Sequence, residues 1–171
     1  MTPILNQHTV EFVSRSPDQT QRLGARLGAL LHAGAVVCLE GALGSGKTCL
    51  AQGIGRGWGV EQRLISPSFV LVREYARPED NVKLYHIDLY RIASVEEVWD
   101  LGADEFLGNE QAVCVIEWAE RAQPLIPHEH LRITLDFADH ASQNRRILYF
   151  TAQGEQHEAM LVEFRRSAFG V

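Results

Sequence analysis

Hydrophobic and polar positions follow two periods along the chain, and each period predicts one kind of element. Residues 9–14 alternate as expected for an edge strand, in which every second side chain faces the core. Residues 35–40 and 112–118 are continuous apolar runs, which are typical of strands buried on both faces of a parallel sheet. We therefore expect a buried central sheet with an exposed edge.

Two pairs of apolar stretches predict antiparallel strands. Residues 69–76 and 82–90 flank a polar turn that contains proline, which is typical of a β-hairpin. Residues 130–138 and 145–153 are expected to form a closing pair. Because hairpin strands run antiparallel, the sheet should be mixed rather than wholly parallel.

The first helix carries clear signals at both ends. Ser16 is a predicted N-cap, Pro17 occupies the first helical position, and Gln19 completes a capping box. Leucines between residues 23 and 31 recur at helical spacing. We expect this helix to stop at Gly34.

Three further helices are predicted, and one of them is unusual. Ser94 and Glu97 form a second capping box that starts a short helix, and residues 156–168 have the composition of a C-terminal helix. A helix should also begin at about Lys47, but it contains glycine at every second position, and each interior glycine costs about 1 kcal/mol relative to alanine. We expect this helix to fray or end within the run, or to use some of the glycines for close packing. These glycines are Gly53, Gly55, Gly57 and Gly59.

A phosphate-binding loop lies between the strand at 35–40 and the glycine-rich helix. The pattern G-x-x-x-x-G-K-[ST] predicts a loop whose backbone N–H groups curl around phosphate oxygens, with a helix N-terminus directed at the same atoms. Its lysine is expected to reach the β and γ phosphates, and its threonine hydroxyl is placed to hold Mg²⁺. The alternative is a glycine-rich turn without function. The loop consists of Gly41, Ala42, Leu43, Gly44, Ser45, Gly46, Lys47 and Thr48.

A loop of this kind needs an acidic group at the end of a nearby strand to complete the metal site. Asp88 and Glu117 both follow apolar strand residues and both qualify. The alternative for either one is a strand-end carboxylate that faces water. Ser66 and Ser68 flank Pro67 in a polar loop before a strand. This loop is expected either to close on the γ-phosphate as a switch or to be a plain turn.

Composition and charge limit the partners. The chain has 171 residues with a formal net charge of −6 and a pI of about 5.6, so its overall field does not attract DNA or RNA.

Three cysteines without a CxxC pair are read as small buried residues in a reducing compartment. The N-terminus lacks a basic start followed by an apolar core, and residues 27–39 are too short to span a bilayer. We expect a cytoplasmic protein without membrane contact, folded as one domain over residues 1–171.

Several motifs together resemble the bacterial tRNA threonylcarbamoyladenosine biosynthesis ATPase family, TsaE. They occur in the family's order as GALGSGKT, SPSFVLVREY, HIDLYR, LGADEFL and IEWAE, and they span residues 41–120. The family usually has aspartate where Ala42 stands and threonine where Ser68 stands. Ser68 keeps the hydroxyl, whereas Ala42 removes a carboxylate beside the phosphates.

The resemblance implies an α/β, P-loop NTPase-like domain of three layers, with a mixed central sheet and helices on both faces. It also implies an ATP-hydrolysing subunit that works with TsaB and TsaD in the threonylcarbamoylation of adenosine-37 of tRNAs reading ANN codons, with tRNA held by those partners. ATP and Mg²⁺ would be the cofactors, hydrolysis would be weak without the partners, and Thr48 and Glu117 would hold the metal. Asp88 and Lys47 would be catalytic, and Arg145 would lie close to the nucleotide.

Three other functions share parts of this pattern. A small-molecule kinase can have the same loop, but it also needs acceptor-binding groups and an arginine-rich lid, neither of which is visible. A GTP-driven switch needs an N-K-x-D element, which the sequence lacks. A structural protein with an inactive loop is disfavoured by the intact Lys47 and Thr48.

Overall fold

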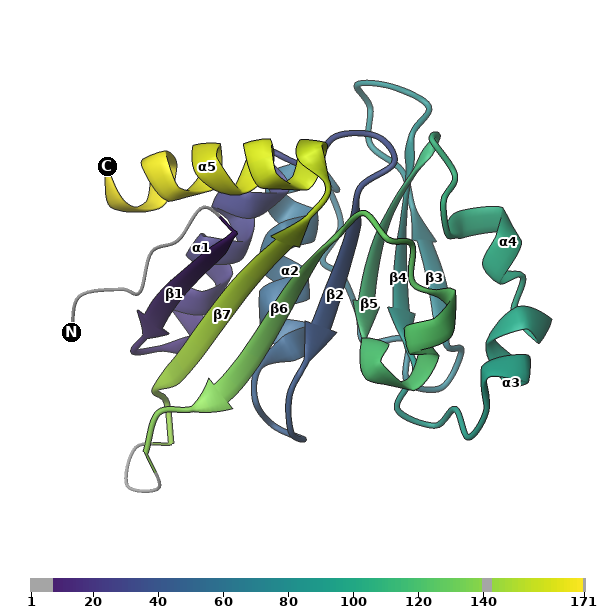
Figure 1. Ribbon diagram of the computed structural model, residues 1–171, viewed down its shortest axis with the longest axis horizontal. Coiled ribbons are helices and arrows are strands. Elements are labelled where there is room, and N and C mark those ends of the chain that lie inside the picture. The colour runs from purple at the N-terminus through teal and green to yellow at the C-terminus, as the bar shows by residue number, and fades with distance from the viewer. Residues whose placement is uncertain (1–7, 140–142, 171) are drawn as a thin grey trace.

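The computed structural model describes residues 8–139 and 143–170. Within these ranges the strands form one seven-stranded sheet in the order β1-β7-β6-β2-β5-β4-β3 (Figure 1). The expectation that no leader peptide is present rests partly on residues 1–7, which lie outside these ranges. The strands are β1 (Thr9–Ser14), β2 (Val36–Glu40), β3 (Val72–Tyr75), β4 (Lys83–Asp88), β5 (Ala112–Glu117), β6 (His130–Phe137) and β7 (Arg146–Gln153).

The sheet is mixed, as the sequence predicted. Strand β2 runs parallel to both of its neighbours, β5 and β6, and β4 runs parallel to β5. The two predicted hairpins are present, because β3 pairs antiparallel with β4 and β6 pairs antiparallel with β7. Strand β1 closes one edge against β7. The four parallel strands at the centre end at the same edge of the sheet, and that edge carries the candidate site.

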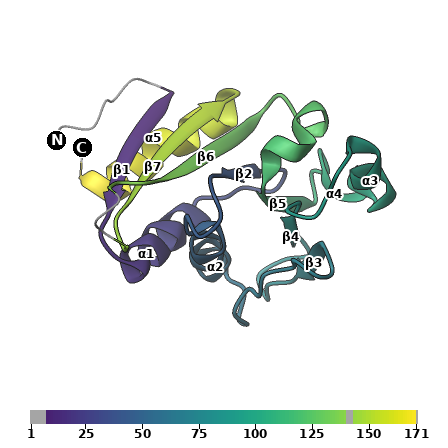
Figure 2. The same ribbon diagram turned by 90° about the horizontal axis from the view of Figure 1, so that it is seen from below.

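Helices cover the sheet on both sides (Figures 1 and 2). Helices α1, α2 and α5 contribute to one apolar core, whereas α3, α4 and the 3₁₀ helix η1 contribute to a second core on the other side of the central strands. The predicted α/β, P-loop NTPase-like architecture is therefore confirmed. The helices are α1 (Pro17–Gly28), α2 (Lys47–Trp58), α3 (Val95–Asp100), α4 (Ala103–Phe106), η1 (Ala119–Leu125) and α5 (Glu155–Phe169).

The glycine-rich helix α2 does not fray. It continues to Trp58 and is capped by Gly59, whose φ of 108° is the left-handed conformation that ends many helices. A Cβ on Gly53 would lie 2.2 Å from the carbonyl oxygen of Gln21, and one on Gly57 would lie 1.9 Å from that of Ala25. The close-packing alternative is thus correct for Gly53 and Gly57, and the helix also ends within the glycine run, because Gly59 is its C-cap.

Helix α1 is shorter than predicted. Its capping signals are confirmed, because the Gln19 N–H donates to Ser16 Oγ and the Arg15 N–H donates to Gln19 Oε1. However, the helix ends at Gly28 rather than at Gly34. A Cβ at Gly28 would lie 2.1 Å from the Ile54 carbonyl oxygen, so this turn of α1 is pressed against the backbone of α2. Gly34, with φ of 88°, lies in the turn that leads into β2.

Smaller differences from the expected elements also have local causes. Strand β3 begins at Val72 instead of residue 69, because the preceding residues form a turn in which Leu71 has φ of 66°. Cys38 and Cys114 are buried as expected, but Cys49 is only partly buried, at the start of α2. Helix α4 was not predicted from the pattern of apolar residues. In the described part of the chain, no helix combines the length and apolarity needed to cross a bilayer.

Candidate nucleotide and metal site

The candidate site lies where β2, β4 and β5 end. The phosphate-binding loop follows β2, Asp88 is the last residue of β4, and Glu117 is the last residue of β5. Asp88 and Glu117 are directly opposite each other in the parallel register, and Glu117 is also paired with Leu39 of β2. The fold therefore brings both predicted carboxylates to the loop, where they line a cavity of about 470 Å³.

The loop has the backbone that its sequence predicts. Gly41, Gly44 and Gly46 have φ values of 139°, 77° and 107°, which side chains rarely adopt. A Cβ at Gly41 would also lie 2.4 Å from the Leu135 carbonyl oxygen, so this glycine is required by space as well as by conformation. Helix α2 starts at Lys47, and its N-terminus therefore faces the cavity.

Lys47 is folded back onto its own loop. Its Nζ donates to the carbonyl oxygens of Gly41 at 2.6 Å and Ala42 at 2.9 Å, and it lies 3.8 Å from the centre of the Trp118 ring. The side chain is almost fully buried, and this desolvation lowers the pKa of Lys47, against the opposing charges of Glu117 and other nearby carboxylates. The ammonium group is thus held by neutral acceptors from which a phosphate group can draw it.

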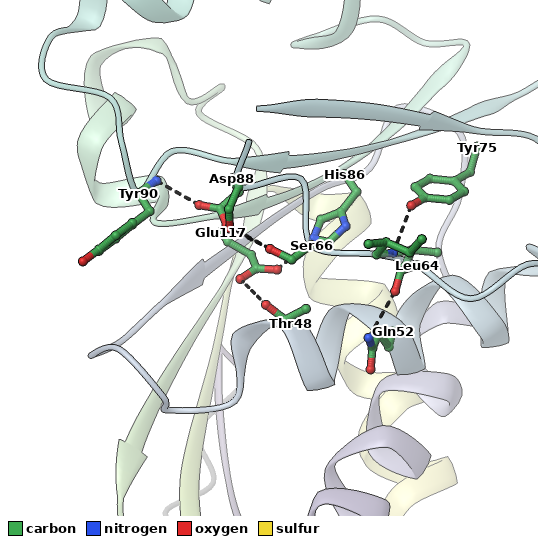
Figure 3. A network of polar contacts seen from close by, with 11 residues as sticks. Thr48, Gln52, Leu64, Ser66, Tyr75, His86, Asp88, Tyr90 and Glu117 are labelled. Atoms are coloured by element: carbon green, nitrogen blue, oxygen red, sulfur yellow. Dashed lines mark hydrogen bonds and ion pairs between the residues drawn. The ribbon is translucent and has the colours of Figure 1, made fainter. Parts of the chain in front are cut away.

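Glu117 is held by hydrogen bonds on both oxygens (Figure 3). The Thr48 hydroxyl donates to Oε2 at 2.8 Å, and His86 Nε2 lies 2.8 Å from Oε1. His86 and Glu117 are both buried. The predicted metal pair of Thr48 and Glu117 is therefore in direct contact, at the N-terminus of α2.

Asp88 connects the predicted switch loop to the site. Its Oδ2 accepts a hydrogen bond from Ser68 Oγ at 2.8 Å and a longer one from Ser66 Oγ at 3.4 Å, while its Oδ1 accepts from the Tyr90 N–H at 2.9 Å. The two serine hydroxyls also lie 2.7 Å apart. Neither Asp88 nor Glu117 is the water-facing strand end that was considered as an alternative, because both side chains are buried.

The switch loop is anchored before its serines and exposed after them. Gln52 of α2 donates to the Leu64 carbonyl, and the Ile65 N–H donates to the Tyr75 hydroxyl, both at 3.1 Å (Figure 3). In contrast, Phe69 and Val70 are 87% and 52% exposed. The switch loop is therefore fixed at its entry and at Asp88, and its exposed side chains follow the two serines.

The arginine in contact with the phosphate-binding loop is Arg146. Its guanidinium donates to the carbonyl oxygens of Ser45 at 3.0 Å and Gly44 at 3.1 Å, and it stacks on Phe137. Arg145, the residue suggested by the resemblance, instead lies 3.7 Å from Asp139 in a half-exposed ion pair. Because neighbouring residues of a strand face opposite sides, a one-residue difference in alignment decides which arginine faces the loop.

The sequence reasoning did not single out His86 or Arg146 as residues of this site. His86 carried a signal, since an imidazole within an apolar strand and two residues before Asp88 must lie on the same face as that carboxylate. Arg146 could be distinguished from Arg145 only once the register of β7 was known.

The oxygen ligands at this site suit Mg²⁺. Thr48 and Glu117 offer a hydroxyl and a carboxylate, both hard oxygen donors, at the point where phosphate oxygens would supply further ligands. Mg²⁺ in nucleotide sites commonly uses one or two protein oxygens together with phosphate and water. The residues present therefore fit this metal, and they fit it only together with a phosphate ligand.

The fold and this loop define a P-loop NTPase-like domain. Residues 14–147 match the sequence profile of the family described as Threonylcarbamoyl adenosine biosynthesis protein TsaE. The chain belongs to the TsaE family.

Individual relatives agree with this assignment. The chain is 43% identical to a TsaE protein of Treponema pallidum over 72% of this chain and 88% of that protein. It is 36% identical to a TsaE protein of Bacillus subtilis over 88% of this chain and 90% of that protein. Its fold is similar to the crystal structure of Bacillus subtilis YdiB, with a TM-score of 0.73 and 29% identity, covering 93% of this chain and 95% of that chain.

Proposed function

We propose that this protein binds and hydrolyses ATP with Mg²⁺ and so supports the threonylcarbamoylation of adenosine-37 in tRNAs that read ANN codons, together with TsaB and TsaD. Membership of the TsaE family supports the pathway, since the family and the relatives cited above are named for threonylcarbamoyladenosine biosynthesis. The observation that carries the nucleotide chemistry is the contact between Thr48 and Glu117 at the end of the phosphate-binding loop.

The residues of the site have separate tasks in this proposal. The loop amides and the N-terminus of α2 bind the phosphates, and Lys47 leaves the carbonyls of Gly41 and Ala42 to contact the β and γ phosphates. Thr48 and Glu117 hold Mg²⁺, which when bound neutralises charge on the phosphate oxygens. Asp88 orients the attacking water.

The switch loop couples this chemistry to a partner. Ser66 and Ser68 are bonded to Asp88, so a change of ligands around Asp88 on hydrolysis changes what holds the loop. The exposed Phe69 and Val70 then lie on a segment whose position depends on the nucleotide. A partner that contacts this segment distinguishes the two nucleotide states.

A second cavity beside the loop is suited to the nucleoside. It measures about 160 Å³ and is lined by Gly44 to Gly46 of the loop and by Pro17, Thr20, Cys49, Gln143, Asn144 and Arg146. The two amide side chains offer both hydrogen-bond donors and acceptors, as a purine edge requires. Arg146, which is fixed on the loop carbonyls, forms one wall.

The net charge of −6 supports an indirect role with tRNA. An acidic protein gains little from the phosphate backbone of a nucleic acid, so the partners are expected to hold the tRNA. No observation at the site favours a small-molecule kinase.

Phosphate release is the test of this proposal. It should be measured with the protein alone, with TsaB and TsaD, with both partners and tRNA, and with a panel of small-molecule phosphate acceptors. The proposal predicts slow release alone and stimulation by the protein partners. Stimulation by a small acceptor, with a phosphorylated product and no effect of the partners, would establish the kinase instead.

A further inference from the structure

His86 is a buried polar residue whose only hydrogen-bond partner, among the described residues, is Glu117. It lies in β4, its side chain is fully buried, and its Nε2 is 2.8 Å from Glu117 Oε1 (Figure 3). Two residues along the same strand, Asp88 stands opposite Glu117. The three side chains therefore come from one face of two neighbouring strands.

The second ring nitrogen of His86 shows that this histidine is not an ordinary buried residue. Its Nδ1 is buried and has no hydrogen-bond partner among the described residues. Burying an unpaired polar atom is unfavourable, so an apolar side chain of similar size would fill this position at lower cost. The contact with Glu117 is thus the interaction that this residue provides.

The chemistry of His86 and Glu117 determines the direction of the hydrogen bond between them. An ionised carboxylate only accepts hydrogen bonds, so Nε2 of His86 carries a hydrogen and donates it to Glu117. The hydroxyl of Thr48 donates to the other oxygen of Glu117, so His86 and Thr48 together hold both oxygens of the carboxylate.

We propose that His86 is a positioning residue that sets the orientation of the Glu117 carboxylate, so that Glu117 and the Thr48 hydroxyl face Mg²⁺ together before the nucleotide binds. This inference rests on the proposed function, because it concerns how the metal site is prepared. Groups that orient a metal ligand from behind typically change metal affinity by 10–100-fold when removed. His86 reaches Glu117 from within the sheet, whereas Thr48 reaches it from α2.

Nucleotide affinity with and without Mg²⁺ provides the test. ATP should be titrated into the wild type, His86→Leu and His86→Gln, once with Mg²⁺ and once with a chelator. His86→Leu removes the donor, and we expect it to weaken binding of ATP with Mg²⁺ about tenfold while affinity without Mg²⁺ stays unchanged. In His86→Gln the amide can still donate to Glu117, and we expect it to recover part of the loss.

Ile87→Val serves as the matched control. Ile87 is the buried neighbour of His86 on the opposite face of β4, in the second apolar core. This variant loses packing without touching Glu117, so it should lower the unfolding temperature and leave the Mg²⁺ dependence as in the wild type. An equal loss of affinity with and without Mg²⁺ in His86→Leu, or no loss in either condition, would overturn the inference.

An NMR measurement without nucleotide tests the pairing even if a variant does not fold. Protein labelled with ¹⁵N at histidine should show His86 with a hydrogen on Nε2, and this preference should disappear in Glu117→Ala. The absence of a hydrogen on Nε2 in the wild type would contradict the pairing. If the wild type bound ATP without any dependence on Mg²⁺, the proposed metal function would fail instead, and the NMR result would still show whether His86 orients Glu117.

Discussion

Replacing Gly57 by alanine tests the contact between α1 and α2, the helix that begins at the end of the phosphate-binding loop. An alanine Cβ at this position would lie 1.9 Å from the Ala25 carbonyl oxygen and 2.6 Å from its carbonyl carbon, whereas such contacts are essentially never below 3.0 Å. Both groups belong to helical backbone, so no side-chain rotation relieves the overlap. The two helices must therefore move apart by about 1 Å.

Two opposing effects determine the magnitude. Alanine is favoured over glycine by about 1 kcal/mol in a helix interior. Overpacking a close contact costs about 1–3 kcal/mol, and a backbone obstacle places this case at the upper end. We expect a net loss of about 2 kcal/mol in the free energy of unfolding, which for a chain of this length lowers the unfolding temperature by roughly 4–8 °C.

Thermal unfolding should be compared with two variants of the same helix. A Cβ at Gly55 would meet the end of the Leu64 side chain at 2.2 Å, and this flexible group can turn aside, so Gly55→Ala should cost less. Arg56 is exposed between the two glycines, and Arg56→Ala should change stability little. A Gly57→Ala protein that unfolds at or above the wild-type temperature would refute the close packing of α1 against α2.

Three other perturbations address the site and the pH response. Glu117→Ala should weaken ATP binding more with Mg²⁺ than without it, and an equal loss in both titrations would assign the metal to Asp88. Ser68→Ala removes the 2.8 Å hydrogen bond to Asp88. Amide hydrogen exchange in the switch loop should become about fivefold faster, because the lost hydrogen bond contributes about 1 kcal/mol to the free energy of opening. Unchanged exchange would show that Ser66 alone holds the loop. Burial lowers the pKa of His157 to about 4, so between pH 6.5 and pH 4 the unfolded chain binds a proton that the folded chain does not. The free energy of unfolding therefore falls as the pH falls through this window. The loss is on the order of 2 kcal/mol after allowance for screening by solvent. Urea unfolding at pH 7 and pH 4.5 should show this slope in the wild type and a smaller one in His157→Gln; equal slopes would place the effect elsewhere.

Local signals in the sequence were sufficient for most elements of this fold. The capping boxes at Ser16 and Ser94 start α1 and α3 as predicted, because they depend on residues only three apart. The continuous apolar strands and the two hairpins were also found from their periods. The motif of the phosphate-binding loop then fixed the edge of the sheet at which the site lies.

Long-range packing decided what the sequence left open. The glycines of α2 lower helix propensity, but Gly53 and Gly57 allow α1 to approach, and tertiary contacts outweighed the local cost. In the same way, the need for glycine at position 28 of α1 comes from the backbone of Ile54, which lies in another helix. A single sequence contains no direct record of such partners.

At the candidate site, too, local sequence signals identified some residues and long-range packing determined the others. Lys47, Thr48, Asp88 and Glu117 were chosen from motif and position, and the structure brings all four to one cavity. The pairing of Glu117 with His86 depends on the register of β4 against β5, which the sequence does not state.

The central claim is that the phosphate-binding loop holds ATP through Lys47. The chain has one other lysine, Lys83, which forms a half-exposed ion pair with Glu74 and provides a control of the same chemistry. Calorimetric titration of ATP with Mg²⁺ should give equal affinities for the wild type and Lys83→Ala and a loss of at least about 100-fold for Lys47→Ala, because charge-assisted contacts with two phosphates are removed. Wild-type affinity in Lys47→Ala would contradict the account.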